Sequence, residues 1–402
     1  MERQRRQCAI AATNALWRNE RGFEENYFET SVVEDDMSDE SDEDCGEIES
    51  TSEDENEVES EDEDDTAPNE QNVMDVNEPT EADLLGKDGE VWMLEPPQTT
   101  GRVGAHNIIG KPGPTSECKK KVTELCDTFD LFITKEMVDM LVKFTNEEGA
   151  TKFGERWKNT STEEIRRFIG LLYLCGIFRS AGESLESLWN KEHGRKVFHS
   201  TMSLHRMREL LQNLRFDSKR ERTERRKNDK MAAIRDFFNA FQLQLPKYFK
   251  PDHSVTVDEQ LVAFRGRCSF RQYMPNKPAK YGLKFFVACC SSTYYVLGII
   301  PYCGKDVITH SLSFDTVCKL VRPVENSGRN VTTDNFYTSL ALARELRRKK
   351  LTLVGTIRAN KRELPPYLLQ KTDREVGSSR FCYKKEATLV SYMTKRKKVS
   401  LY

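Results

Sequence analysis

A run of β-branched and apolar residues that one carboxylate interrupts constrains the fold of this chain more than any other feature. Residues 253–263 have the sequence HSVTVDEQLVA, and such a run is typical of a strand that is covered on both faces. Asp258 lies inside it, and a carboxylate in a buried strand is costly unless it is paired, hydrogen-bonded or bound to a metal. A strand Asp is most often a solvated edge residue, so Asp258 alone is weak support for catalysis. Glu259 is expected to point to the opposite face.

A dense run of cations with interleaved aromatic rings follows this strand. That mixture suits phosphate backbones and bases. An ordinary solvated loop is the alternative, and Pro275 and Pro278 fit a loop in either case. The candidate DNA-binding residues of the loop are Arg265, Arg267, Arg271, Lys277 and Lys280.

A second carboxylate, Asp334, ends a short predicted strand over residues 330–333. A helical pattern and a further strand, over residues 351–357, come next. A strand that ends in Asp, then a helix, then a strand places the carboxylate at the carboxyl edge of a sheet, where ligand sites gather. Two Asp side chains on neighbouring strands can hold Mg²⁺ together with substrate phosphates. Asp258 and Asp334 are therefore the candidate catalytic and metal-binding residues.

The charges are divided unevenly along the chain. The net charge of the whole chain is −3, yet residues 34–65 hold twenty acidic and no basic side chains, and residues 101–402 carry a net +24. The acidic stretch has almost no apolar residues, so residues 1–100 are predicted to form a disordered acidic arm. The arm is either a solvated spacer or an internal DNA mimic that competes for the basic body. The contrast between an acidic arm and a strongly basic body points to nucleic-acid binding.

Helical periodicity dominates from residue 118 to residue 250, after a Gly/Pro-rich linker over residues 101–117. Helices are expected near 130–144, from Thr162, near 204–214 and over 231–245. The basic surface of this domain includes the candidate DNA-binding residues Arg220, Arg222, Arg225 and Arg226. Residues 283–290 and 293–301 suggest a hairpin, and a helix is expected over 314–320. Three strands, a helix, a strand, a helix and a strand is the order of a ribonuclease H-like sheet.

The chain resembles the piggyBac transposase family and its transposable-element-derived relatives at two long motifs, VDEQLVAFRGRCSFRQYMPNKPAKYGLK and TTDNFYTSLALARELRRKKLTLVGTIRANKRELP. The resemblance covers residues 101–402. It implies an α/β fold with a ribonuclease H-like DDE transposase core, whose first part spans residues 251–360, and an α-helical dimerisation and DNA-binding domain over residues 118–250. Residues 361–402 would then begin an insertion domain.

The same resemblance implies a chemistry and a location. It implies Mg²⁺-assisted cleavage of double-stranded DNA, with Asp258 and Asp334 as the first two catalytic carboxylates, insertion at TTAA targets, and a nuclear protein that forms a homodimer. No signal peptide or membrane span appears in the sequence, so no membrane partner is expected.

The sequence departs from the family pattern at the third catalytic Asp. No TKGGVD-like segment occurs, the last core helix is not found, and the cysteines lack the spacing of a zinc domain. We therefore expect an incomplete core, a weak Mg²⁺ site, no zinc, and a transposase-derived DNA-binding protein that does not cut. The alternative is an active cut-and-paste transposase that targets TTAA, of which this sequence is an incomplete gene product.

Overall fold

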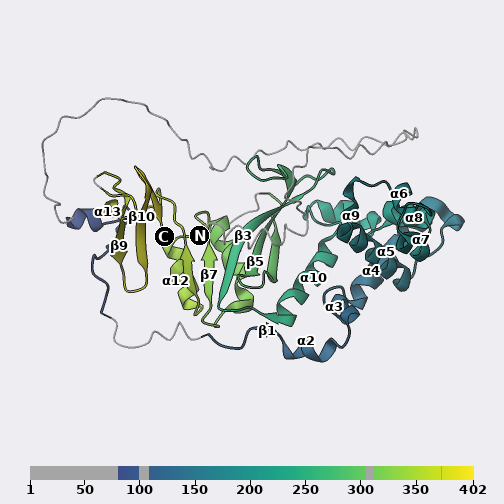
Figure 1. Ribbon diagram of the computed structural model, residues 1–402, viewed down its shortest axis with the longest axis horizontal. Helices are drawn as coiled ribbons and strands as arrows, with labels where there is room; N and C mark the ends of the chain where they lie inside the picture. Colours follow the sequence, from purple (N-terminus) through teal and green to yellow (C-terminus); the bar gives the residue numbers. More distant parts are fainter. Residues whose placement is uncertain (1–79, 99–107, 305–310, 373) are drawn as a thin grey trace.

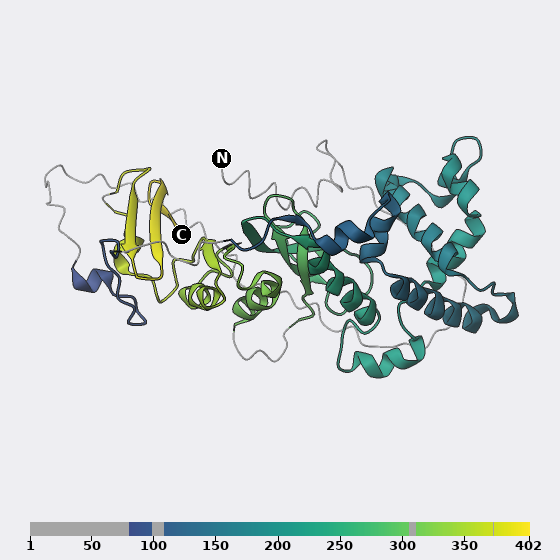
Figure 2. The ribbon, with the colours of Figure 1, turned by 90° about the horizontal axis from the view of Figure 1, so that it is seen from below.

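Three parts of the chain lie in a row in the structure (Figure 1). The computed structural model describes residues 80–98, 108–304, 311–372 and 374–402. A helical part stands at one end, a mixed sheet at the centre, and a small antiparallel sheet at the other end, and a view turned by 90° shows the same order (Figure 2). The predicted disordered arm lies largely outside the described residues, including the acidic stretch 34–65.

The helical part agrees with the predicted helical domain in its main elements. Ser161 caps α5 by accepting a hydrogen bond from the N–H of Glu164, one residue before the predicted Thr162. The helix expected near 130–144 is two helices, because the backbone leaves the helical conformation at Ile133 and is extended at Thr134. The helices are α2 (Ser116–Lys121), α3 (Leu125–Phe132), α4 (Lys135–Phe153), α5 (Thr162–Ile177), α6 (Leu185–Trp189), α7 (Lys196–Thr201), α8 (Leu204–Asn213), α9 (Lys219–Arg226) and α10 (Arg235–Tyr248).

Apolar faces of these helices form one core. The fully buried side chains include Val138 of α4, Phe168 of α5 and Leu210 of α8. Each lies on the apolar face of an amphipathic helix. A short ladder of β1 (Gly113–Pro114) with β2 (Phe249–Lys250) closes this part next to the central sheet.

The central sheet has the strand order β6-β5-β3-β7-β8, and β4 also pairs with β5. β3, β5 and β6 are antiparallel neighbours, whereas β3, β7 and β8 are parallel. Three antiparallel strands followed by two parallel ones make this a ribonuclease H-like sheet, as the sequence predicted. The strands are β3 (Ser254–Ala263), β4 (Gln272–Tyr273), β5 (Tyr281–Cys290), β6 (Val296–Pro301), β7 (Asn330–Thr333) and β8 (Thr352–Gly355).

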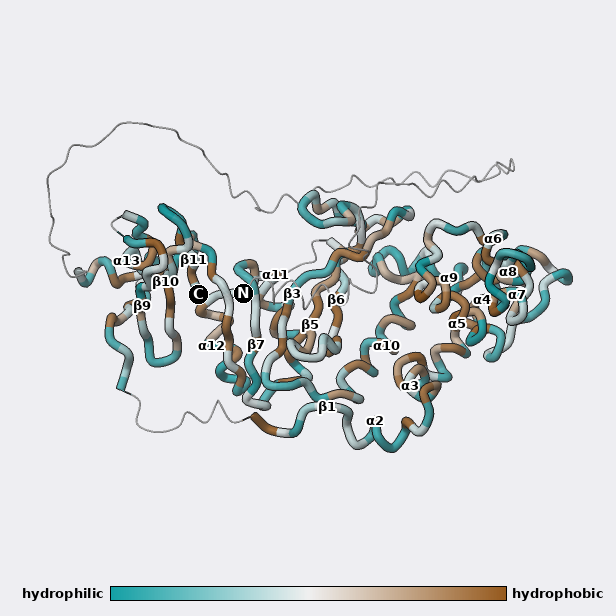
Figure 3. The backbone as a smooth tube through the Cα atoms, viewed as in Figure 1, coloured by the Kyte–Doolittle hydropathy of each residue, from teal (hydrophilic) through white to brown (hydrophobic). Residues whose placement is uncertain are grey.

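One face of this sheet packs against α11 (Leu312–Leu320) and α12 (Leu340–Arg348). Val255 and Val257 of β3 are fully buried beneath Val317 and Leu342 of these helices. The hydropathy colouring shows the hydrophobic segments of β5 at the centre of the molecule (Figure 3). This core holds β3 and β7 in place, and it therefore fixes the positions of the two candidate carboxylates.

A segment near the amino terminus packs on the small sheet formed by β9 (Ser379–Tyr383), β10 (Thr388–Lys395) and β11 (Lys398–Leu401). Met93 and Tyr383 exchange backbone hydrogen bonds of 2.9 and 2.8 Å. Trp92 is only 2% exposed and donates from Nε1 to the carbonyl of Glu363 at 2.8 Å. This segment was predicted to be part of the disordered arm. Residues 80–98 are ordered instead, because Trp92 and Leu84 bury apolar surface against α13 (Pro366–Leu369) and the sheet.

None of the described helices combines the length and the apolar character that a membrane span requires.

Candidate active site

Asp258, within β3, and Asp334, directly after β7, lie level with each other just beyond the paired residues of these two parallel strands. β3 pairs with β7 so that Ser254 faces Asn330 and Thr256 faces Thr332, which is an offset of 76 residues. The same offset places Asp258 level with Asp334, directly after the last residue of β7. The register therefore brings together the two carboxylates that the sequence singled out.

A tight turn after β7 orients Asp334. Its Oδ1 accepts a hydrogen bond from the N–H of Phe336 at 3.0 Å, and its carbonyl accepts from the N–H of Thr338 at 3.1 Å. The hydroxyl of Thr338 also donates to that carbonyl at 2.7 Å and lies 2.7 Å from the hydroxyl of Thr333. The side chain is thus held by its own local sequence, DNFYTS.

Both carboxylates are electrostatically unfavourable in their ionised form. Burial is the main cause that raises the pKa of Asp258 to about 6; the charges of Asp334 and Glu259 act in the same direction, and the hydrogen bond from the Glu259 N–H opposes them. Burial also raises the pKa of Asp334, followed by the charge of Glu259, and the N–H of Phe336 opposes this. A divalent cation would relieve this repulsion, because it favours the charged form of both groups.

Glu259, on the face of β3 opposite to Asp258, is the third carboxylate of an acidic edge that consists of Asp258, Glu259 and Asp334. Its side chain is 12% exposed, and its carboxylate lies 3.2 Å from Nζ of Lys277 and 3.6 Å from Nζ of Lys284. Alternation along β3 does separate it from Asp258. Asp334, however, follows the end of β7: the charge of Glu259 raises its pKa, and its own charge raises the pKa of Asp258.

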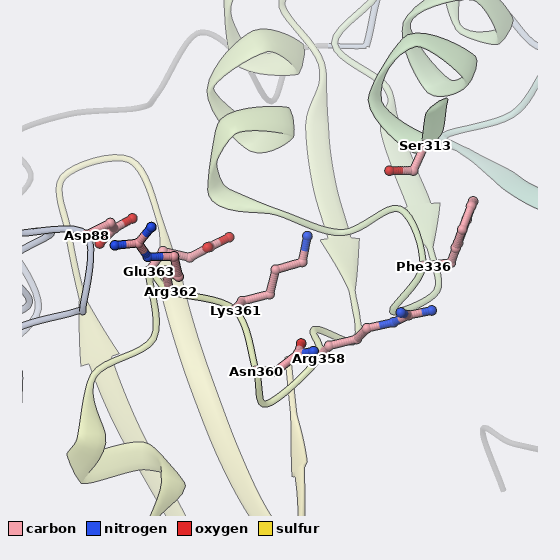
Figure 4. A pocket seen from close by; sticks show the side chains of 8 residues that line it. All are labelled: Asp88, Ser313, Phe336, Arg358, Asn360, Lys361, Arg362 and Glu363. Carbon is pink, nitrogen blue, oxygen red and sulfur yellow. The ribbon is translucent and has the colours of Figure 1, made fainter. Parts of the chain in front are cut away.

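A cavity of about 850 Å³ adjoins this edge. Phe336 lies in its wall two residues after Asp334, and Arg358, which lowers the pKa of Asp334, extends toward the Phe336 ring (Figure 4). This cavity was not predicted from the sequence, although its cations belong to the run RANKRE after β8. The lining residues are Asp88, Ser313, Phe336, Arg358, Asn360, Lys361, Arg362 and Glu363.

The predicted DNA-binding residues after β3 fall into two groups. Arg265, Arg267 and Lys280 are exposed. Arg271 instead donates to the carbonyls of Arg265 and Gly266 at 2.9 and 3.2 Å and stacks on Tyr281, so it stabilises the loop itself. Lys277 pairs with Glu259 and anchors the loop to the acidic edge.

The four arginines of α9 divide in the same way. Arg220 and Arg226 are exposed. Arg222 forms a two-pronged pair with Asp217, whose side chain is 2% exposed, and Arg225 lies 2.8 Å from Asp236. The sequence showed the charges but could not show which of them have partners within the fold.

Asp258 and Asp334 fit a magnesium ion only in part. Within the described stretches of the chain, no group of three or more His, Cys, Asp or Glu side chains could hold a metal ion. Two adjacent carboxylates can still bind Mg²⁺ when substrate phosphates and water supply the remaining ligands. The nine cysteines in the described residues are free thiols.

A ribonuclease H-like sheet with two carboxylates level on neighbouring strands is the arrangement that the resemblance to DDE transposases implies. A family model described as Transposase IS4 matches residues 126–402. The chain is 22% identical over 263 residues to PiggyBac transposable element-derived protein 3 of Homo sapiens, which covers 63% of this chain and 42% of that protein.

A solved structure is also similar to the chain. The cryo-EM structure of a piggyBac transposase synaptic complex with hairpin DNA matches with a TM-score of 0.69 and 38% identity, over 73% of this chain and 63% of that one. The chain thus spans less than two thirds of the length of both relatives. The chain belongs to the transposase family whose model matches residues 126–402, and within that family it is of the piggyBac type.

Proposed function

We propose that this chain is a piggyBac transposase-derived protein that binds double-stranded DNA in the nucleus and does not cut it. The observation that carries the proposal is the acidic edge itself, because a cavity lined by three cations adjoins it and Lys277 of the loop after β3 pairs with Glu259 there. Phosphate oxygens of DNA would bind these cations, and the net +24 of residues 101–402 would add a long-range attraction.

Asp258 and Asp334 are the residues that would hold Mg²⁺ in this proposal. The bound ion would supply neutralisation of charge on the phosphate oxygens. The protein contributes the fixed register of β3 and β7, the turn that orients Asp334, and a partly dry environment. Lys277 and Lys284 form ion pairs with Glu259, so the described residues offer two carboxylates without such a partner at this edge. Two-metal chemistry needs more ligands, and for this reason we expect no cleavage.

An active transposase that targets TTAA is the second candidate function. Both Asp residues are retained, they are level across β3 and β7, and the similar structure is a synaptic complex with hairpin DNA. Incubation of the 402-residue chain with terminal-repeat DNA and Mg²⁺ or Mn²⁺ separates the two. We expect no nicked or joined strands. Nicking that disappears in Asp258→Ala would favour the active enzyme.

A homodimer through the helical part is a further component of the proposal. Leu125 of α3 is 88% exposed, and Tyr173 and Ile177 of α5 are 61% and 70% exposed. The rings of Phe129 and Tyr173 are 6.4 Å apart, which joins the two helices into one apolar surface. Sedimentation analysis should show dimers that Ile177→Glu disrupts, whereas Leu243→Glu, at an equally exposed apolar position of α10, should have no effect.

A salt series tests DNA binding directly. Fluorescence anisotropy with duplex DNA should show an affinity that falls steeply with salt, and the double variant Arg265→Ala and Arg267→Ala should reduce the slope by about 2. Lys395→Ala with Arg396→Ala is the control, because it removes the same charge from exposed positions of the small sheet. Equal losses in both double variants would mean that binding does not involve the loop.

A further inference from the structure

The small sheet presents a row of aromatic side chains on its outer face. Side chains alternate along a strand, so Phe381 and Tyr383 of β9 lie on the face opposite to the buried Cys382. The register places Val390 of β10 beside Phe381, and Val390 and Tyr402 exchange backbone hydrogen bonds of 2.9 and 2.8 Å. Residues paired in this way share a face. The aromatic face consists of Phe381, Tyr383, Val390, Tyr392 and Tyr402.

The rings of the aromatic face are accessible, whereas the other face of the same sheet is packed. Phe381 is 42% exposed, Tyr392 40% and Tyr402 39%. The rings of Phe381 and Tyr383 are nearly parallel, and their centres lie 6.2 Å apart. The other face is buried against Trp92 and α13, and the sheet stands at one end of the molecule in both views (Figures 1 and 2). The core of this part therefore uses only one side of the sheet.

Cations stand at both ends of the aromatic face. Lys395, Arg396 and Lys397 are exposed in the turn that joins β10 to β11. Lys385 is exposed in the turn between β9 and β10, at the opposite end of the sheet. Residues 374–402 hold eight basic and two acidic side chains. A face with positively charged ends is complementary to a negatively charged partner.

Hydroxyl groups lie between the rings. By the same alternation, the aromatic face also carries Ser379, Thr388, Thr394 and Ser400, and its described side chains include no carboxylate. A purely apolar partner would leave these hydroxyls without hydrogen bonds, which is unfavourable. Unpaired bases instead stack on aromatic rings and form hydrogen bonds through their edges, while the phosphates bind the cations. The bases of a duplex are stacked on each other and cannot bind in this way.

We propose that the aromatic face binds single-stranded nucleic acid, with bases stacked on Phe381 and Tyr392 and the phosphates on the cations of the two turns. β10 has eight residues and is about 25 Å long at about 3.3 Å per residue. This length provides room for about four nucleotides, the lower end of the site sizes of single-strand-binding folds. The surface is separate from the acidic edge, and it goes beyond the proposed binding of duplex DNA.

Removal of the rings tests the stacking. A short fluorescent oligothymidylate is titrated with the full chain, both alone and with excess unlabelled duplex, and an oligouridylate tells DNA from RNA. The double variant Phe381→Leu and Tyr392→Leu keeps two apolar side chains but no ring. Its affinity for the single strand should fall at least about tenfold, because each stacked base contributes about fivefold or more. Its affinity for the duplex should not change.

The matched control is the double variant Phe381→Tyr and Tyr392→Phe. It keeps both rings, so it should bind the oligothymidylate as the wild type does. Lys395→Ala with Arg396→Ala tests the cations separately. The slope of single-strand affinity against salt should fall by about 1.4 in this variant, because a single strand releases about 0.7 counterions per phosphate contact. Thermal unfolding of all variants checks that the fold is intact.

Three results would overturn the inference. Equal single-strand affinity of the wild type and the double leucine variant would mean that no base stacks on this face. Complete displacement of the oligothymidylate by duplex would mean that both bind one surface. Dimers that Phe381→Glu dissociates in sedimentation analysis would identify a second copy of the chain as the occupant. A chain that binds the oligothymidylate but no duplex would contradict only the proposed function.

Discussion

Two groups of carboxylates in this molecule have opposite electrostatics. At the acidic edge, burial and mutual repulsion raise the pKa of Asp258 to about 6. Between the amino-terminal segment and the small sheet, hydrogen bonds from Arg344 and Lys384 lower the pKa of Glu90 to about 2. Arg344 lies 2.6 Å from Glu90 and 2.9 Å from Glu386, so every charge of this second group has a partner.

The difference shows what each group is for. The Glu90 cluster, which consists of Glu90, Arg344, Lys384 and Glu386, joins α12, the small sheet and the amino-terminal segment, and its charges stabilise the folded state. The acidic edge lowers stability, and a fold retains such repulsion where a ligand is expected to compensate for it.

The largest effect is expected where the amino-terminal segment is anchored. Trp92→Ala should lower the free energy of unfolding by about 3–5 kcal/mol, because it opens a cavity beside the Glu90 cluster. Val91→Ala is the control, since the neighbouring Val91 is 64% exposed. Urea denaturation measures both variants. A loss below about 1 kcal/mol for Trp92→Ala would mean that this region does not stabilise the fold.

Asp258→Asn should stabilise the protein at neutral pH by about 2–3 kcal/mol at most. The pKa of Asp258 is about 6 in the folded state and 3.8 unperturbed. Protonated Asp258 therefore contributes fully to the free energy of unfolding below pH 3.8, and this contribution is lost as pH rises through 6. The gain in the variant should therefore vanish near pH 4. Thermal unfolding across this range checks it, and a variant less stable than wild type at neutral pH would contradict the assigned repulsion.

Glu90→Gln should do the opposite and cost about 1–2 kcal/mol at neutral pH. The pKa of Glu90 is lowered from 4.5 to about 2, so its contribution is present above 4.5 and is lost as pH falls toward 2. The variant and the wild type should converge in acid. A pH-independent difference between them would indicate lost packing instead of a lost charge pair.

The smallest effect is expected for Arg226→Ala. Arg226 is exposed on α9, so the free energy of unfolding should change by less than about 0.5 kcal/mol. The slope of DNA affinity against salt should fall by about 1. Arg222→Ala is the comparison, because Arg222 holds the buried Asp217 and its loss should destabilise the fold. Identical stability losses in both variants would erase the distinction between paired and exposed cations.

Strand patterns were sufficient to predict the central sheet and the two Asp side chains at its edge. The predicted strand over residues 330–333 matches β7, and the hairpin and the two helices that follow it lie close to their predicted positions. The physical reason is that a carboxylate in a β-branched run is costly, so its presence indicates a special position even in a single sequence.

Partnerships between distant residues were not predictable in this way. Lys277 and Arg271 have the sequence signal of DNA-binding residues, yet within the fold Lys277 pairs with Glu259 and Arg271 holds a turn. Trp92 was missed because the surrounding acidic composition obscured one large apolar side chain.

The contact of Trp92 with Glu363 has a consequence for synthesis of the chain. The two residues are 271 positions apart, so Trp92 leaves the ribosome long before its partner exists. At about 5–20 residues per second, the indole waits for roughly 10–60 s. During that interval the helical part and most of the central sheet can fold, while an apolar segment next to the most acidic stretch of the chain stays in water. The acidic neighbours then keep the nascent chain dispersed until the small sheet emerges and closes over Trp92.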